Sequence, residues 1–193
     1  MNPVRPSENA FTGLEAAIVL IAFVIVASAF AYVILGAGFL TTQKSQEVVH
    51  SSVQGASSSV QLAGELYGVS TNSETVDMLN FTVTLAPGGG VIDFDKVSIT
   101  YSNETFVETL TPVTGLRSTS TTPGTWAIIK ADGETGPTNN LLENGEQFTI
   151  SAHPTYGTPK NTVLSVEIKP SVGSTITIRR TVPGAVNIVN TLY

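Results

Sequence analysis

Glu15 is the residue whose position most indicates a chemical role in this 193-residue chain. It closes the stretch Phe11-Thr12-Gly13-Leu14-Glu15, which separates a short polar leader from an uncharged apolar run over residues 16–43. A membrane helix needs no acidic entrance of this kind. Thr12 and Glu15 have the Thr-x-x-Glu spacing of a capping box, in which both side chains accept backbone N–H groups of the first turn. The sequence therefore predicts that a helix begins at Thr12.

No other group of residues has the spacing of a catalytic centre. His50 falls in a segment of serine and glutamine, and His153 precedes Pro154, so neither has a local acidic or nucleophilic partner. The glycines at 88–90 lead into a strand pattern, whereas a phosphate-binding loop must open a helix. We therefore predict a protein that is not an enzyme and that uses no cofactor.

Asp93 and Asp95 are the only metal ligands that the sequence offers for consideration. Both lie on one face at the start of a predicted strand, where two carboxylates could bind a hard cation such as calcium. Two ligands do not make a site, and the alternative is a pair of solvated residues at a strand entrance. The sequence thus predicts no metal site, with these two residues as weak candidates.

Two sequons could carry glycans. Asn80-Phe81-Thr82 and Asn103-Glu104-Thr105 are the two Asn-x-Thr triplets of the chain. Such triplets arise often by chance in Thr-rich sequence. We nevertheless predict that at least one of Asn80 and Asn103 carries a glycan.

The net charge and the absence of cysteine exclude several classes of partner and cross-link. The formal net charge of −6 argues against nucleic acid, which requires a basic face. The chain has no cysteine, so neither disulfides nor a thiolate metal site can form. A domain exported without disulfides must be held together by its core or by neighbouring subunits.

The apolar run predicts a membrane-spanning helix. Residues 16–40 are uncharged, and 25 helical residues extend about 38 Å, enough to cross a bilayer core of about 30 Å. Arg5 precedes the span, so the positive-inside rule places the remainder of the chain outside. The leader, residues 1–10, has no apolar region of its own and is not a conventional secretory signal.

Beyond the span, a seam of small apolar residues predicts that the helix continues to about Leu66. The spacing is 4-3-4-3-4, two positions per heptad, and the surrounding residues are poor helix formers, so this part needs packing partners. The alternative is a juxtamembrane stalk that lies on its own domain. The seam consists of Val49, Val53, Ala56, Val60, Ala63 and Tyr67.

After a turn-rich break at 68–74 the apolar period changes from 3.6 to 2. Half-buried strands are predicted around Phe81–Leu85, Val97–Tyr101, Phe148–Ile150, Leu164–Ile168, Ile176–Ile178 and Val186–Ile188. Turns such as Pro123-Gly124 and Asn144-Gly145 separate them. Seven or eight strands in about 120 residues predict a β-sandwich of immunoglobulin-like size, with Trp126 in its core. The fold class is thus α+β: a leader (1–10), a long hydrophobic helix (11–67) and a β-sandwich domain (68–193).

The N-terminal sequence AFTGLEAAIVLIAF resembles that of archaeal flagellins (archaellins), whose precursors carry class III, pilin-like leaders. Three later stretches add to this resemblance: residues 89–101, 141–150 and 168–183. Together they span nearly the whole chain. The family's leaders usually carry basic residues just before the cut, whereas this chain has Glu8 and Asn9.

The resemblance implies processing between Ala10 and Phe11 by a membrane prearchaellin peptidase. It further implies that Glu15 pairs with the new N-terminal amine of a neighbour, and that an ATPase and a membrane platform protein assemble the subunits. The partners are then other copies of the chain and other archaellins, first in the membrane and later in a filament outside the cell.

We therefore expect a structural subunit of the archaellum, the rotating filament that drives swimming. The alternatives are a subunit of a non-rotating adhesive pilus and, from a different class, a membrane-anchored β-sandwich binding domain. The leader and the seam favour the two filament hypotheses, and the later family-like stretches favour the archaellum.

Overall fold

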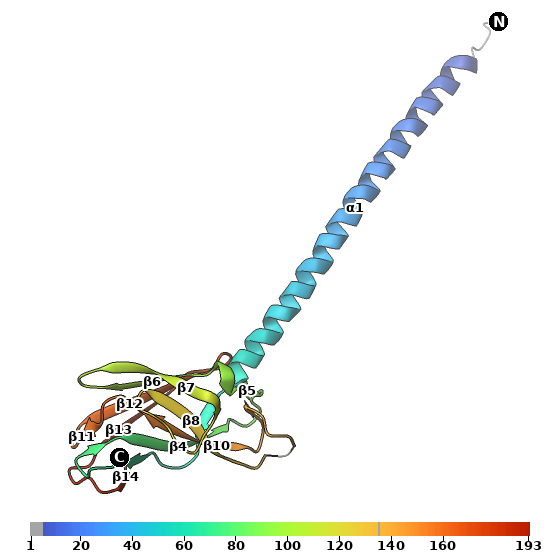
Figure 1. The fold of residues 1–193 in the computed structure, drawn as a ribbon. Helices are drawn as coiled ribbons and strands as arrows, with labels where there is room; N and C mark the ends of the chain where they lie inside the picture. Colours follow the sequence, from blue (N-terminus) through green and yellow to red (C-terminus); the bar gives the residue numbers. More distant parts are fainter. Residues whose placement is uncertain (1–5, 135) are drawn as a thin grey trace, which may run out of the picture. The chain divides into compact units, whose positions relative to one another are not determined.

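The computed structural model describes residues 6–134 and 136–193 and contains two compact units. The first ends at Ser51 and belongs to one helix, α1 (Pro6–Ser57); the second comprises Ser52–Tyr193 and holds all the described strands. Figure 1 shows α1 as one continuous helix and the strands gathered in a single domain. The predicted order, a long hydrophobic helix followed by a β-sandwich, is confirmed.

Helix α1 begins earlier than the capping box predicts. Its first residue is Pro6, so Thr12 lies inside the helix and is not its N-cap. Proline is favoured in the first helical turn because it has no N–H to leave unpaired and its φ angle suits a helix. Within α1, residues 12–53 contain an apolar stretch long enough to cross a membrane.

The helix ends at Ser57, so its predicted continuation to Leu66 is wrong. Val60 lies in a strand with 4% of its surface exposed, and the backbone N–H of Ala63 donates to the Thr82 carbonyl at 2.8 Å. Serines at 57–59 and Gly55 weaken the helix, while pairing with a neighbouring strand buries Val60 and Leu66 in the core. Residues 58–67 therefore belong to the β-domain.

The β-domain contains fourteen strands in its described residues, seven of them six residues or longer. Of these seven, the sequence predicts five: β4, β6, β10, β12 and β13. A short 3-10 helix, η1 (Phe94–Lys96), follows β5. The strands are β1 (Val60–Leu62), β2 (Tyr67–Val69), β3 (Thr75–Val76), β4 (Met78–Leu85), β5 (Ile92–Asp93), β6 (Ser98–Asn103), β7 (Val107–Arg117), β8 (Thr125–Asp132), β9 (Leu141–Leu142), β10 (Gln147–His153), β11 (Thr158–Pro159), β12 (Val163–Lys169), β13 (Ile176–Thr181) and β14 (Val189–Thr191).

The main strands form two antiparallel layers (Figure 1). One has the order β13-β12-β6-β7, and the other has the order β8-β10-β4-β2-β14 with β1 beside β4. Strand β7 joins them, because its first half pairs antiparallel with β6 and its second half pairs parallel with β8. The two small sheets, β3 with β11 and β5 with β9, lie outside this path.

The side chains between the layers form one hydrophobic cluster. Period-2 alternation turns every second residue of β4 inward, and β10, β6 and β12 contribute in the same way. Trp126 is fully buried, as predicted, and its ring lies 6.4 Å from that of Phe94. The ring of Phe94 also lies 5.2 Å from that of Phe148.

Strands β7 and β8 have no clean alternation in sequence, and sequence patterning missed both. Pro112 and Gly115 interrupt β7, and the β8–β10 register shifts between Ile128 and Lys130. Near the C-terminus the sequence predicts a strand at 186–188, but the strand is Val189–Thr191 and Ile188 is 71% exposed. Here Asn190 Oδ1 accepts from the Asn187 N–H and Asn190 Nδ2 donates to the Asn187 carbonyl. These two bonds hold residues 187–190 in a turn, so the strand begins later.

The chain enters the β-domain through a tight contact at Ser58. The Ser58 hydroxyl accepts from the Gly90 N–H at 3.1 Å, and its carbonyl accepts from the Ser174 N–H at 3.2 Å. Gly173 has φ +109°, and a Cβ there would lie 1.9 Å from the Ser58 carbonyl oxygen. Glycine is therefore required at 173, and the residue that follows α1 is held in place.

Candidate functional site

The described part of α1 exposes an apolar surface on all sides of the helix. Among its described residues, the large hydrophobic side chains from Leu14 to Val53 are each more than half exposed. Isolated exposed hydrophobic residues are ordinary, but a continuous apolar surface of this length is not stable in water. Such a helix must lie in a bilayer or pack against other helices.

Glu15 stands at one end of a groove on this surface. The groove has a volume of about 580 Å³, and its other lining residues are Thr12, Ala16, Val19, Leu20 and Phe23. It therefore combines a carboxylate with an apolar floor. Ala10 and Phe11 lie within the backbone span of α1, and their side chains are outside the described part of the structure.

The structure divides the predicted seam. Val49 and Val53 lie on α1 and are 59% and 62% exposed, whereas Val60 and Ala63 belong to the β-domain. Ala56 is helical, but its side chain is outside the described residues. Assembly roles on the helix can therefore be assigned only to the part of the seam before Ser57.

The two sequons have different surroundings. Asn80 is in the middle of β4, paired on both sides, and its Oδ1 is buried without a hydrogen-bond partner among the described residues. Asn103 lies at the β6–β7 turn, where its Oδ1 accepts from Thr105 N–H and Phe106 N–H at 2.9 Å each and from the Thr105 hydroxyl at 2.8 Å. Its Nδ2 donates to the Tyr101 hydroxyl at 3.3 Å. Of the two, Asn103 is the one placed at an exposed turn.

Asp93 and Asp95 do not converge on a common point. Asp93 pairs with Lys96 at 2.8 Å and accepts the Asp95 N–H at 3.1 Å, and the hydrogen bond from Lys96 holds the pKa of Asp93 below its usual value. The Asp95 carboxylate accepts from Asn140 at 2.9 Å. Both carboxylates are therefore already bonded to groups of the β-domain. Among the described residues no group of three acidic, histidine or cysteine side chains could hold a metal ion.

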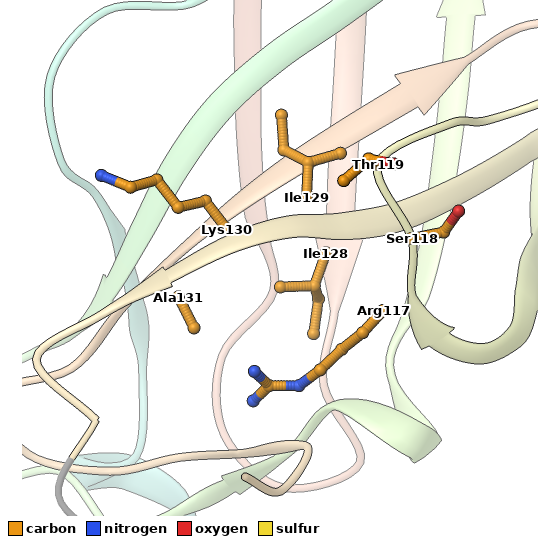
Figure 2. A pocket seen from close by; sticks show the side chains of 7 residues that line it. All are labelled: Arg117, Ser118, Thr119, Ile128, Ile129, Lys130 and Ala131. Atoms are coloured by element: carbon orange, nitrogen blue, oxygen red, sulfur yellow. The ribbon is translucent and has the colours of Figure 1, made fainter.

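A pocket of about 470 Å³ opens where β7 and β8 diverge (Figure 2). Arg117 lines it, but in Figure 2 its guanidinium is directed away from Lys130. The guanidinium instead bonds Glu134 at 2.5 and 3.2 Å and lies 5.3 Å from the centre of the Phe148 ring. Lys130 pairs with Asp132 at 2.8 Å. Both cations of this pocket are thus paired with carboxylates. Arg117 anchors the loop after β8 through Glu134, whereas Lys130 and Asp132 pair within β8 itself.

Sequence reasoning missed this Arg117 network because its members are far apart in the chain. Arg117 also donates to the Asn139 carbonyl and to Asn140. Arg117 and Glu134 are separated by 17 residues with no periodic relation. The hydrogen bond from Arg117 lowers the pKa of Glu134. No local motif signals such a pair.

An exposed apolar helix that leads into a compact β-sandwich defines a protein anchored or assembled through that helix. The chain belongs to the archaeal-type flagellin family, whose model matches residues 10–180. It is 39% identical over 196 residues to probable flagellin 2 of Archaeoglobus fulgidus, with 93% of this chain and 92% of the relative covered.

Solved structures agree with this assignment. The archaeal flagellum of Methanospirillum hungatei matches with a TM-score of 0.73 and 35% identity, covering 93% of this chain and 98% of that one. A flagellin from Methanocaldococcus jannaschii has a TM-score of 0.58 at 16% identity, covering 70% of this chain and 96% of that one, and shares the fold. The protein is thus a structural subunit of the archaellum, a filament at the cell surface. The predicted family, fold and filament function are confirmed.

Proposed function

We propose that α1, after removal of the leader, forms the core of the archaellum filament, while the β-domain lies outside it. The observation that carries this proposal is the apolar surface of α1, which is exposed over its whole described length. Before assembly the same surface is satisfied by the lipid bilayer, because residues 12–53 are long enough to span it. The subunit is stored in the membrane and moves into the filament.

Helix burial stabilises the assembled filament relative to helices exposed to water. Removing apolar area from water contributes about 25 cal/mol per Å², so a buried 25-residue apolar helix contributes tens of kcal/mol before entropic costs. Compared with lipid the gain is smaller and comes from packing and hydrogen bonds. Release from the membrane therefore requires work, which an assembly ATPase with a membrane platform protein supplies in this proposal.

The groove beside Glu15 suggests why the leader is removed: cleavage creates an N-terminal amine that can pair with this carboxylate. Cleavage between Ala10 and Phe11 by a prearchaellin peptidase leaves a positively charged amine on an aromatic residue. The ring of Phe11 fits an apolar groove of about 580 Å³, and its amine then meets the Glu15 carboxylate of a neighbouring copy. An amine and a carboxylate that enter the core together are neutralised, whereas either alone would be an uncompensated buried charge.

The processing step is tested by the mass and N-terminal sequence of protein from sheared surface filaments. We expect Phe11 as the first residue. Filament protein that retained residues 1–10 would exclude the cut and with it the pairing of the new amine.

The pairing step is tested separately with Glu15→Gln. Glutamine keeps the shape and the hydrogen bonds but not the charge, so we expect normal membrane insertion and cleavage with few filaments. Glu47→Gln is the matched control, because Glu47 lies on the same helix, 67% exposed and paired with Lys44. Equal filament yield from both variants would show that Glu15 makes no ion pair in assembly.

A further inference from the structure

Tyr32 is an unusual residue in the apolar helix. It has the largest exposed fraction, 81%, of the exposed large hydrophobic side chains in the described chain. In residues 16–40 the only side chains with hydrogen-bonding groups are Tyr32 and Ser28. Tyr32 lies about 6 Å along the axis from the middle of this segment, so it is not at a membrane surface where tyrosines usually anchor a span.

The hydroxyl of Tyr32 needs a partner once the helix is buried. Within the described chain it makes no hydrogen bond, although the ring reaches far from the helix axis. A buried hydroxyl without a partner costs about 1–3 kcal/mol in protein interiors. A filament core built from this helix must therefore supply an acceptor close to the ring.

The same helix has a groove that suits a tyrosine ring. It has a volume of about 430 Å³ and is lined by Ala31, Ile34, Leu35, Gly38, Phe39 and Thr42. Gly38 has no side chain to fill this groove, and a Cβ at this position would meet no atom within 4 Å in the single subunit. The Thr42 hydroxyl donates to the Gly38 carbonyl at 2.9 Å, so the hydroxyl oxygen keeps lone pairs that can accept a second hydrogen bond.

The positions of the ring and the groove suit a filament. At about 100° per residue, Tyr32 and Thr42 point about 80° apart around the helix, so two copies can make a repeating contact with two different faces. Helical filaments require such heterologous contacts. Ser28 lies one turn before Tyr32 on the same face, and mutual contact between these two residues would instead give a two-fold symmetric pair.

We propose that Tyr32 of one subunit packs into the Gly38 groove of a neighbouring copy and donates a hydrogen bond to its Thr42 hydroxyl. The contact fixes the axial register between neighbouring helices, as a single buried polar residue does in coiled coils. This inference rests on the proposed helical core. It adds the contact that sets how the helices are aligned.

The groove is tested first with Gly38→Leu against Gly36→Leu. Both glycines have open space around them in the single helix, and leucine is the better helix former, so neither change harms α1 itself. Only Gly38 lines the groove. We expect Gly38→Leu to give processed, membrane-retained subunits without filaments, while Gly36→Leu still assembles. Equal assembly of the two variants would overturn the groove.

The hydrogen bond is tested with Tyr32→Phe and Thr42→Val. Each removes one hydroxyl and little volume, and Thr41→Val is the matched control because Thr41 bonds the Ala37 carbonyl at 2.8 Å but does not line the groove. We expect each test variant to speed subunit loss from sheared filaments on heating about five- to tenfold, which is the effect of one hydrogen bond. The double variant should lose no more than either single one.

Filaments of Tyr32→Phe that match the wild type, or fully additive losses in the double variant, would overturn the assigned bond. Failure of the helical core itself has a different signature. If α1 is not the core, Ile25→Asp, which places a charge on the same apolar surface, would assemble normally together with all the other variants.

Discussion

At the scale of single residues, Asn103 combines two roles that are usually studied separately. Its side chain closes the β6–β7 turn by accepting two backbone N–H groups, and it also forms the acceptor of a sequon. The Nδ2 of Asn103 donates a hydrogen bond to the buried Tyr101 hydroxyl, which is also hydrogen-bonded to the Thr158 hydroxyl at 2.5 Å. A glycan replaces only one of the two Nδ2 hydrogens, so modification and the bond to Tyr101 are compatible.

We propose that Asn103 rather than Asn80 carries a glycan, and Thr105→Ala tests this without breaking the turn. The variant loses the sequon and the hydroxyl bond of Thr105 but keeps both backbone bonds to Asn103, so we expect loss of glycan mass and a decrease of about 1 kcal/mol or less in the unfolding free energy. Asn103→Ala should cost about 1–3 kcal/mol even in unglycosylated protein, because it leaves donors unpaired. Mass spectrometry and denaturant unfolding measure the two effects. An unchanged mass in Thr105→Ala would refute Asn103 as the site.

We expect Asp77 to make the stability of the β-domain depend on pH in acid. Burial tends to raise its pKa, but hydrogen bonds from Thr71 and Thr75 outweigh this and hold it below the usual 3.8. A carboxyl whose pKa is depressed in the folded state stabilises the fold above its unfolded pKa, and this stabilisation is lost as the pH falls through the folded value. We expect the unfolding free energy to decrease below about pH 4. Asp77→Asn should reduce that slope and lower stability at neutral pH, as denaturant titrations at several pH values would show.

The slope should shrink rather than vanish in that variant. Asp93 and Glu134 also have lowered pKa values, through hydrogen bonds from Lys96 and Arg117, and both remain in Asp77→Asn. An acid slope identical to that of the wild type would mean that Asp77 contributes nothing to it.

At the scale of elements, the end of α1 separates two kinds of valine. Val53 is the last seam position on the helix whose side chain is described, and it is 62% exposed. Val60, seven residues later, lies in β1 beside Leu85 and is 4% exposed. The heptad spacing that joins them in sequence has no counterpart in the structure.

The same substitution should therefore fail in two different ways. We expect Val53→Asp to leave a folded β-domain in the membrane and to block filaments, because its charge would be buried against neighbouring helices. Val60→Asp should instead unfold the β-domain, since an unpaired charge in the core costs several kcal/mol. Protease resistance of the membrane-bound domain distinguishes the two. A Val60→Asp domain as resistant as Val53→Asp would show that β1 is not part of the core.

At the scale of the whole molecule, the two units have different requirements for stability. The β-domain contains its own hydrophobic cluster, whereas the large hydrophobic side chains of α1 that the structure describes are exposed. The β-domain can thus fold within a single subunit, whereas the apolar surface of α1 is buried only when several subunits assemble.

A fragment of residues 58–193 should therefore fold alone and stay monomeric. A fragment of residues 68–193 should not, because it lacks Val60 and Leu66, and two fully buried side chains contribute about 3–6 kcal/mol of a typical total of about 5–15 kcal/mol. Circular dichroism and size-exclusion chromatography compare the fragments. Equal stability of the two would show that residues 58–67 do not contribute to the fold.

The sequence by itself determined the features that depend on local pattern. The apolar run, the leader and Glu15 indicated the class of protein, and period-2 alternation located the buried face of β4, β6, β10 and β12. These succeed because each residue's environment follows from its nearest neighbours in the chain.

Tertiary structure alone decided where the helix ends, how the layers join and which sequon is accessible. Val60 continues a heptad pattern, yet burial beside Leu85 outweighs the weak helix propensity of the serines before it. Strand β7 pairs in parallel with β8, and Arg117 bonds Glu134. Neither contact is indicated by the sequence pattern of the segments that it joins. The physical reason is that strand partners, buried ion pairs and exposed edges depend on contacts between residues distant in the chain, and such contacts exist only after the chain has folded.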